Sequence, residues 1–390
     1  MSESAVVSVV RCSGYQPEKV LPAVRQSIQL LGGFQKFFKP GAKVFIKINH
    51  LAAVKPECAV TTHPVFLEAV LHLVKESGVL PVVGDDIEEN FTVSGIEDVC
   101  RKMNVELVNL KHVKHRQAGN PENRWIRSAA VPEIVCKADC IINLPKLKTH
   151  AATLLTNAVK NIYGFFPFAT RVNGHRLCPG GAEFSELLVD LYSLVKPHLN
   201  IVDAITGMEG EGPMAGKPVN IGLVIAGADA VAVDAVAGEI MGLKPEQVLS
   251  TKLSTQRELG TGDIEKIEIK GESIVSVRLK KISLPAPPWY EYIPSNILKK
   301  AAGQLRVRPA VIQRKCIGCS DCFSRCPAGA IVMKDKKAVI DYARCLGCLC
   351  CQEVCRQKAI RSKRNIVGNI IMKVYFFKRA VTYVLLKLKI

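Results

Sequence analysis

Nine of the fifteen cysteines of this chain lie between Cys316 and Cys355, and their spacing constrains the fold more than any other feature. Eight of them form two runs of C-x2-C-x2-C-x3-C, in the segments CIGCSDCFSRCPAGAI and CLGCLCCQEVCRQKAI. The two segments align without a gap and share Cys, Gly, Ala and Ile at equivalent places. Cysteines crowded at a regular spacing are typical of metal ligands rather than of disulfides.

Each run has the spacing of an iron–sulfur ligand set. Three cysteines separated by two residues can reach three corners of one 4Fe–4S cubane, while the fourth points away and is free to close the other cluster. Over residues 308–360 the sequence resembles the bacterial two-cluster ferredoxins. That resemblance implies two 4Fe–4S clusters with crossed ligands. The expected sets are Cys316, Cys319, Cys322 and Cys355 for the first cluster and Cys345, Cys348, Cys351 and Cys326 for the second.

Three details of the runs bear on this assignment. Arg356 stands where the first run has Pro327, so the second turn lacks a proline that helps to reverse the chain, although no ligand is lost. Cys350 is a ninth thiol that fits neither run, and we expect a spare buried cysteine. Zinc is the alternative metal, but four-cysteine zinc sites use two separated CxxC pairs. One-electron transfer is the expected function, with purely structural clusters as the alternative.

The positive charge of the chain is concentrated at its C-terminal end. The net charge is +18, and residues 301–390 alone hold 19 Lys or Arg against 4 Asp or Glu. Part of this excess positive charge offsets the clusters, because an oxidised 4Fe–4S core with its four thiolates has a net charge of about −2. With no aromatic-interleaved basic motif and no zinc-finger spacing, the sequence predicts no nucleic-acid partner.

Residues 1–283 predict an α/β domain with a doubly wound, mostly parallel sheet. Short β-branched runs alternate there with amphipathic stretches, which is the pattern of such a fold. Strands are expected at 5–10, 43–48, 80–83, 105–109, 140–144, 200–205 and 220–226. Helices are expected at 17–31, 64–77, 184–195 and 229–241.

Two further segments complete the predicted domain organisation. The proline-rich stretch 284–307 is expected to link the α/β domain to a small α+β ferredoxin-like domain at 308–360. In residues 361–390, apolar positions recur at helical spacing among eight Lys or Arg and no acid, which predicts a basic amphipathic helix. Charges interrupt every apolar run in it before it is long enough to span a membrane.

The tail and the N-terminus bear on location. The first residues, MSESAVVSVV, lack the basic and apolar regions of a signal peptide, so we expect a cytoplasmic protein. The tail either packs on the protein's own surface or lies on an anionic membrane face. In the second case the protein is peripheral at the inner face of the membrane.

Polar and charged residues follow several of the predicted strands. Ligands of open α/β sheets bind beyond the carboxyl ends of the strands, where such residues converge if the sheet is parallel. In chain order they are Lys47, Asn49, His50, Asp85, Asp86, Lys146, Lys148, His150 and Asp203. Each lysine taken alone is explained as a solvated strand end, whereas four strand ends together favour a site.

The chemistry of these residues suits an anion. Ammonium groups with an imidazole and an asparagine bind a carboxylate or a phosphate, so the candidate catalytic residues are Lys47, Asn49, Lys146, Lys148 and His150. The adjacent Asp85 and Asp86 either offset this charge or hold a divalent ion.

Several motifs extend the candidate site: IKIN, TTHP, LPKLKTH, AVKNIYG, VDAITGMEGEGP and DAVAVDAVAGEIMG. Together they resemble the domain-of-unknown-function 362 family, over residues 40–250. Members of that family often carry a ferredoxin module, and no settled reaction is implied. The motif positions are Lys47, Asn49, His63, Lys146, Lys148, His150, Lys160, Asn161 and Asp234. Of these, His63 and Asp234 also have structural explanations, as a helix-start residue and a helix N-terminal acid.

The sequence leaves three functions open. The leading one is a redox protein whose two clusters pass single electrons between a donor or acceptor protein and an anionic substrate or cofactor in the α/β cleft. The second is a non-catalytic electron carrier or assembly protein, whose front domain docks a partner. The third is a non-redox, metal-assisted enzyme that uses the Asp pair and has structural clusters.

Overall fold

The computed structural model describes residues 5–87, 90–178, 180–285, 308–326 and 328–363. The chain divides into two compact units, Met1–Pro285 and Ala286–Ile390. The strands of the first unit are β1 (Ala5–Arg11), β2 (Val44–Ile48), β3 (Val82–Asp85), β4 (Glu106–Asn109), β5 (His115–Gly119), β6 (Ser128–Pro132), β7 (Cys140–Leu144), β8 (Lys146–His150), β9 (Leu154–Thr156), β10 (Leu199–Glu209), β11 (Lys217–Gly227) and β12 (Ile267–Gly271). Its helices are α1 (Pro17–Leu30), α2 (Pro64–Glu76), α3 (Ile96–Lys102), α4 (Glu133–Cys136), α5 (Ala158–Asn161), α6 (Phe168–Leu177), α7 (Gly181–Leu194), α8 (Ala230–Ile240), α9 (Leu249–Gln256) and α10 (Ile274–Val277).

One mixed sheet organises the N-terminal unit, in the order β12-β1-β11-β10-β7-β2-β3-β4, with β8 beside β10 and β9 beside β8. The strands from β10 to β4 run parallel to one another, whereas β11 is antiparallel to both of its neighbours. The predicted α/β fold with a mostly parallel sheet is confirmed. Because parallel strands end at the same edge, the residues that follow β2, β3 and β7 are brought close together.

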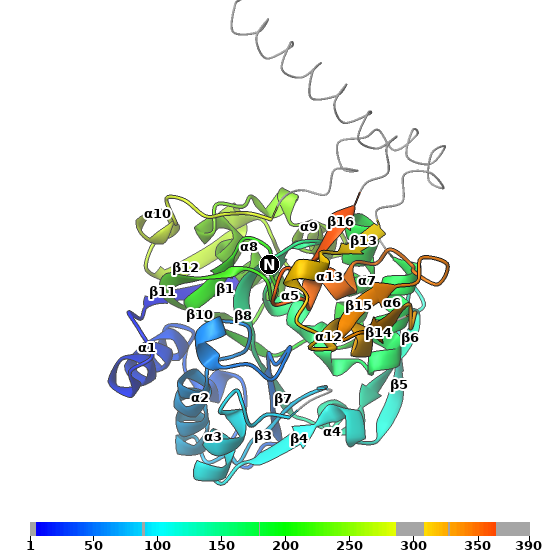
Figure 1. Cartoon of the computed structure of the whole chain (residues 1–390). Coiled ribbons are helices and arrows are strands. Elements are labelled where there is room, and N and C mark those ends of the chain that lie inside the picture. The colour runs from blue at the N-terminus through cyan, green and yellow to red at the C-terminus, as the bar shows by residue number, and fades with distance from the viewer. Residues whose placement is uncertain (1–4, 88–89, 179, 286–307, 327, 364–390) are drawn as a thin grey trace, which may run out of the picture. The chain divides into compact units, whose positions relative to one another are not determined.

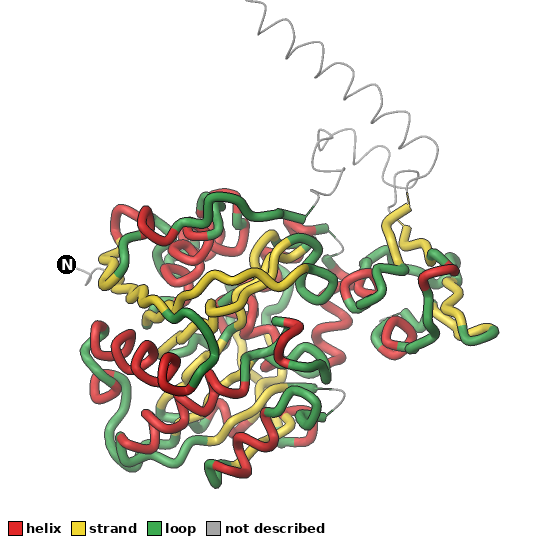
Figure 2. Tube along the Cα trace, turned by 60° about the vertical axis from the view of Figure 1, so that its left-hand side comes forward, coloured by secondary structure: helices red, strands yellow, loops and turns green. Residues whose placement is uncertain are grey.

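Helices cover both faces of this sheet (Figures 1 and 2). On one face, α1, α2 and α3 share a core with Val44, Ile46 and Ile48 of β2. On the other face, Phe45 joins a core that includes side chains of α5, α7 and α8. Successive residues of a strand point to opposite faces, so Lys47 belongs with Phe45 to the second face.

Every predicted strand and helix of this unit is present, with shifted ends, and several elements were not predicted. The strands β10 and β11 extend further than expected and pair as a hairpin as far as Glu209 and Lys217. The hairpin of β5 and β6 was also missed. The most consequential omission is β8, because its alternating lysines give it the composition of a loop although all five of its residues are buried.

The C-terminal unit contains β13 (Arg308–Val311), α12 (Asp321–Ser324), β14 (Ile331–Lys334), β15 (Lys337–Ile340), α13 (Cys350–Glu353) and β16 (Ile360–Lys363). Two antiparallel pairs, β13 with β16 and β14 with β15, form its sheets. The two cysteine runs have the same backbone geometry: φ is 76° at Gly318 and 73° at Gly347, and 65° at Ser320 and 60° at Leu349. The small α+β region predicted at this end is therefore present, and the two runs fold alike.

Two predicted segments fall largely or wholly outside the described residues. These are the proline-rich linker, apart from residues 284–285, and the tail helix beyond residue 363. Within the part of the chain that the structure describes, no helix combines the length and the apolar character needed to cross a membrane.

Asp234 joins two helices of the N-terminal unit. It lies inside α8, and its carboxylate accepts hydrogen bonds from the N–H groups of Ala158 (2.7 Å) and Val159 (3.3 Å) at the start of α5. It therefore serves the N-terminus of a neighbouring helix, whereas Asp229 caps α8 itself. Burial raises the pKa of Asp234 to about 7, although both N–H groups act in the opposite direction.

This raised pKa predicts a pH dependence of stability. The folded chain holds the Asp234 proton more tightly than the unfolded chain, so the free energy of unfolding falls as the pH rises from about 4 to about 7. Asp234→Asn cannot ionise and should gain stability relative to the native chain over that interval, by at most about 1.4 kcal/mol per pH unit. Urea unfolding of both proteins at several pH values measures the difference. A difference that does not change with pH would contradict this account.

Candidate functional site

The predicted site residues of the N-terminal unit meet at the carboxyl ends of the parallel strands, where most are buried and Asn49 is half-buried. Lys47, near the end of β2, places its Nζ 2.8 Å from Oδ1 of Asp85, at the end of β3. The same Nζ donates to the Ile48 carbonyl at 2.7 Å, and the other oxygen of Asp85 accepts the N–H of His50 at 2.8 Å. Burial lowers the pKa of Lys47 and raises that of Asp85, while the attraction within the pair opposes both shifts.

The two adjacent aspartates each have a cationic partner. Asp85 pairs with Lys47, and Asp86 pairs with Arg171 of α6. The sequence left open a divalent ion here, and the structure places the Lys47 ammonium at Asp85 and the Arg171 guanidinium at Asp86. The geometry therefore supports the other role considered for these carboxylates, which is to offset positive charge.

Lys146 begins β8 and forms a second buried ion pair. Its Nζ lies 2.9 Å from Oδ2 of Asp203 and 2.6 Å from the hydroxyl of Tyr15, and neither charged side chain is exposed. The Tyr15 hydroxyl donates to Oδ1 of Asp203 at 2.6 Å, and the N–H of His63 donates to Oδ2 at 2.9 Å. The Tyr15 ring stacks on His63 at 3.6 Å, and burial lowers the pKa of His63 to about 4. His63 also accepts the N–H of Val65 at the start of α2, as a helix-start residue.

Lys148 differs from the other two lysines because its partners are neutral. Its Nζ donates to Oδ1 of Asn49 at 2.6 Å and to the Val60 carbonyl at 2.7 Å. Among the described residues, no carboxylate lies within ion-pair distance of it. Burial, followed by repulsion from Lys146 and Lys160, lowers its pKa well below the usual value. An ammonium held here has two acceptors for its three N–H groups and no adjacent charge to balance it.

A chain of side-chain amides fixes Asn49 in place. Asn49 donates to Oδ1 of Asn161 at 3.0 Å, Asn161 donates to Asn143 at 2.7 Å, and Asn143 donates to Asn200 at 2.9 Å. Because each amide is oriented by the next, the carbonyl oxygen of Asn49 is directed at Lys148. The predicted residues Asn49 and Asn161 therefore act together.

His150 ends β8 as a neutral imidazole. Its Nδ1 accepts the N–H groups of Ala152 (3.1 Å) and Thr153 (3.3 Å), which places the proton on Nε2. Burial, and then repulsion from Lys160 and His175, lowers its pKa well below the usual value. Lys160 lies over the rings of Tyr163 and Phe184, with Nζ 5.4 Å and 5.2 Å from their centroids.

His175 and Tyr15 are parts of this cluster that sequence reasoning missed. His175 stacks on Phe184 with centroids 4.4 Å apart, and burial lowers its pKa to about 3. Nothing in its local sequence marks it, because α6 is brought to the site only by tertiary packing. Tyr15 did carry a signal, because it follows the first predicted strand as the other site residues follow theirs.

In the C-terminal unit the predicted cluster cysteines line two cavities. One cavity is lined by Cys316, Cys319, Cys322 and Cys355. The other is lined by Cys326, Cys345, Cys348 and Cys351. Each cavity thus takes three cysteines from one run and the fourth from the other. Cys350, which lies in this described region, lines neither cavity.

Backbone amides point at some of these sulfurs. Ala330 donates its N–H to Cys326 and Ala359 donates to Cys355, both at 3.2 Å, and Ala338 donates to Cys316 at 3.5 Å. Among the residues that the structure describes, no three His, Cys, Asp or Glu side chains are grouped to hold a single ion. A cubane takes its four thiolates on four separate irons, so sulfurs spread around a cavity and hydrogen-bonded by amides fit a 4Fe–4S cluster.

Comparison with known proteins identifies the class of both units. Residues 44–239, half of the chain, match the family described as Domain of unknown function (DUF362), and residues 315–359 match a 4Fe-4S dicluster domain. A thylakoid-associated protein of Synechocystis sp. is 32% identical over 263 residues, which cover 65% of this chain and 79% of that protein. The chain therefore belongs to the DUF362 family, as its motifs indicated.

Relatives of the C-terminal unit are named as subunits of larger enzymes or complexes. The pyruvate synthase subunit PorD of Methanocaldococcus jannaschii is 40% identical over 77 residues, 19% of this chain and 88% of that protein. One component of an ion-translocating oxidoreductase complex of Methanosarcina acetivorans is 47% identical over 51 residues, 13% of this chain and 19% of that component. The C-terminal unit is thus an iron–sulfur, ferredoxin-like domain, and its similarities are to electron-transfer proteins.

The contrast between Lys146 and Lys148 predicts unequal costs of mutation. Lys146→Met leaves the Asp203 carboxylate buried without a cation and should lower the free energy of unfolding by about 3–5 kcal/mol. Lys148→Met removes an unbalanced charge and leaves two neutral acceptors, so it should cost less than about 2 kcal/mol. Urea unfolding at neutral pH measures both.

Glu68→Gln is the matched control for this pair of variants. It removes the exposed ion pair with Lys102 and should change stability by less than about 1 kcal/mol. Equal costs for Lys146→Met and Lys148→Met would show that the carboxylate partner does not distinguish the two lysines.

Proposed function

We propose that this chain is an iron–sulfur redox protein with two 4Fe–4S clusters, which passes single electrons between a partner protein and an anionic substrate or cofactor bound at the lysine cluster. The observation that carries the proposal is the crossed grouping of eight cysteines around two cavities. When bound, a 4Fe–4S cluster accepts or gives one electron at a time. The side chains of the chain then have two tasks, which are to dock the partner protein and to bind the anion.

The C-terminal unit offers a surface for a redox partner. Cys319 is exposed, and beside the cysteines of its set Ile317 and Phe323 are 65% and 50% exposed. Large apolar side chains left at the surface are typical of protein interaction sites. PorD and the oxidoreductase-complex relative are themselves named as subunits of larger enzymes or complexes, which supports a protein partner for this unit.

The lysine cluster supports an anionic ligand. Lys47 and Lys146 are neutralised by Asp85 and Asp203, so the unbalanced charge resides on Lys148. An oxyanion that accepts the third N–H of Lys148 would balance this charge in a buried setting, where a charge-assisted hydrogen bond is strong. Burial lowers the pKa of Lys148, and a bound oxyanion would oppose this shift, so the ammonium form of Lys148 and the anion favour each other.

One observation favours the alternative of a non-catalytic carrier or assembly protein. Lys47, Lys146 and Lys148 are fully buried, and their hydrogen bonds are made within the N-terminal unit. A cluster of this kind can also serve to fix the fold of a docking domain. The two functions differ in whether Lys148 contacts a ligand.

The crossed ligand sets predict a pattern of iron loss. The native chain should hold about eight irons, and Cys319→Ala or Cys355→Ala alone should leave about four, because each removes a ligand of the same cluster. The double variant of these two should lose no more iron than either one, whereas Cys319→Ala with Cys326→Ala should lose both clusters. Iron and sulfide assays on anaerobically purified protein measure this. Cys350→Ala is the control and should keep about eight irons; additive loss in the first double variant would overturn the crossed sets.

The ligand role of Lys148 predicts a loss of anion binding without a loss of clusters. Lys148→Met should retain the iron content of the native chain but bind oxalate or inorganic phosphate at least about tenfold more weakly, since one buried charge-assisted hydrogen bond is removed. Isothermal titration calorimetry of the holoprotein measures this, with the exposed Lys252→Met as control. Binding that Lys148→Met leaves unchanged would favour the carrier.

A further inference from the structure

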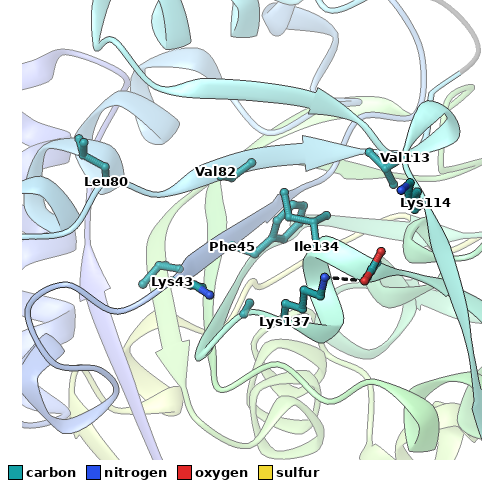
Figure 3. A pocket seen from close by; sticks show the side chains of 11 residues that line it. Lys43, Phe45, Leu80, Val82, Val113, Lys114, Ile134 and Lys137 are labelled. Carbon is teal, nitrogen blue, oxygen red and sulfur yellow. Dashed lines mark ion pairs between the residues drawn. The ribbon is translucent and has the colours of Figure 1, made fainter.

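A second, chemically different groove lies at the opposite ends of the strands. It has a volume of about 420 Å³ and lies between the beginnings of β2 and β3 and the short helix α4. Its floor and walls are apolar, formed by Phe45, Val82, Val113 and Ile134, and Leu80 stands at its end with 71% of its surface exposed. Figure 3 shows Leu80, Val82 and Val113 in a row, with Phe45 and Ile134 below them.

The mouth of this groove is basic. Lys43, Lys114 and Lys137 border it, against the single carboxylate of Glu133. Glu133 is already paired with Lys137 at 2.5 Å. A dashed line at Lys137 marks this ion pair in Figure 3. The pKa of Glu133 is lowered first by Lys137 and then by Lys114 and Arg116. The electrostatic potential at this edge of the sheet is therefore positive. Among the described residues, the ammonium groups of Lys43 and Lys114 have no carboxylate partner within ion-pair distance.

This groove is separate from the lysine cluster at the other end of the sheet. The ring of Phe45 packs on that of Phe165, with centroids 5.9 Å apart, and Nζ of Lys47 lies 5.7 Å beyond, over the Phe165 ring. Two aromatic rings therefore stand between the groove and the Lys47–Asp85 pair. The groove is a site in its own right and does not depend on the proposed redox function.

We propose that the groove binds an amphipathic anion, a single alkyl chain that ends in a carboxylate. The row of apolar side chains suits an extended chain, and burying it there removes apolar surface from water on both partners. The carboxylate reaches Lys43 or Lys114, whose ammonium groups are not in an ion pair among the described residues. The volume is that of a site for one small ligand, so a two-chain phospholipid is too large.

The test uses decanoate, below its micelle concentration, and decyltrimethylammonium, which has the same chain and the opposite charge. Calorimetric titration of the full-length holoprotein at low ionic strength should show saturable binding of decanoate and at least about tenfold weaker binding of the cation. The double variant Lys43→Gln, Lys114→Gln should bind decanoate at least about fivefold more weakly. Ile134→Trp fills the groove and should abolish saturable binding.

The matched control is Lys217→Gln, Lys252→Gln, which removes two exposed lysines that do not line the groove and should leave decanoate binding unchanged. No saturable binding of decanoate would overturn the proposal. So would equal binding of the two probes, or decanoate binding that the Lys43, Lys114 variant leaves unaffected. Because these lysine substitutions are at the surface, loss of folding does not confound the result.

Discussion

Burial of lysine ammonium groups at the carboxyl ends of the parallel strands is the constraint on which the N-terminal unit depends. A charge taken out of water is tolerated only when a counter-charge and hydrogen bonds replace the lost solvent. Asp85 supplies these for Lys47, and Asp203, with the Tyr15 hydroxyl, supplies them for Lys146. Asp85 comes from β3 and Asp203 from β10, so the two ion pairs join neighbouring strands of the sheet, β2 to β3 and β8 to β10.

Lys148 differs from Lys47 and Lys146 because it is buried without a carboxylate partner among the described residues. The function proposed for the unit follows from this difference. Stability alone would favour an apolar residue or a carboxylate partner at such a position, so a buried ammonium with only neutral acceptors is costly. Buried charged groups without a counter-charge are found mostly at functional sites, because there a ligand rather than the protein supplies the missing partner. In the C-terminal unit the fold likewise brings together groups from distant parts of the sequence, since each cavity is lined by three cysteines of one run and one of the other.

The outcome of the sequence predictions depended on whether the signal was local. The strands and the major helices were predictable because β-branched runs and helical periodicity are local, and the cysteine grouping followed from the spacing together with the resemblance to two-cluster ferredoxins. The strand β8 was missed because its lysines have the composition of a loop, and they become buried only through partners more than fifty residues away in the chain. The positions of His175 and of the Asp86–Arg171 ion pair depend on how α6 packs, and no local sequence pattern predicts that packing. The convergence of Lys47, Asn49, Lys146, Lys148 and His150 was predictable from strand ends, whereas their burial was not.

The most direct test of the central claim is electron paramagnetic resonance of the anaerobically purified, dithionite-reduced protein, recorded with and without small carboxylates and phosphates. We expect the signal of two spin-coupled 4Fe–4S clusters, together with a change in that signal when an anion binds to the native chain and no change in Lys148→Met. Zinc in place of iron would contradict the cluster assignment. A coupled signal that no anion alters would contradict the link between the clusters and the lysine site.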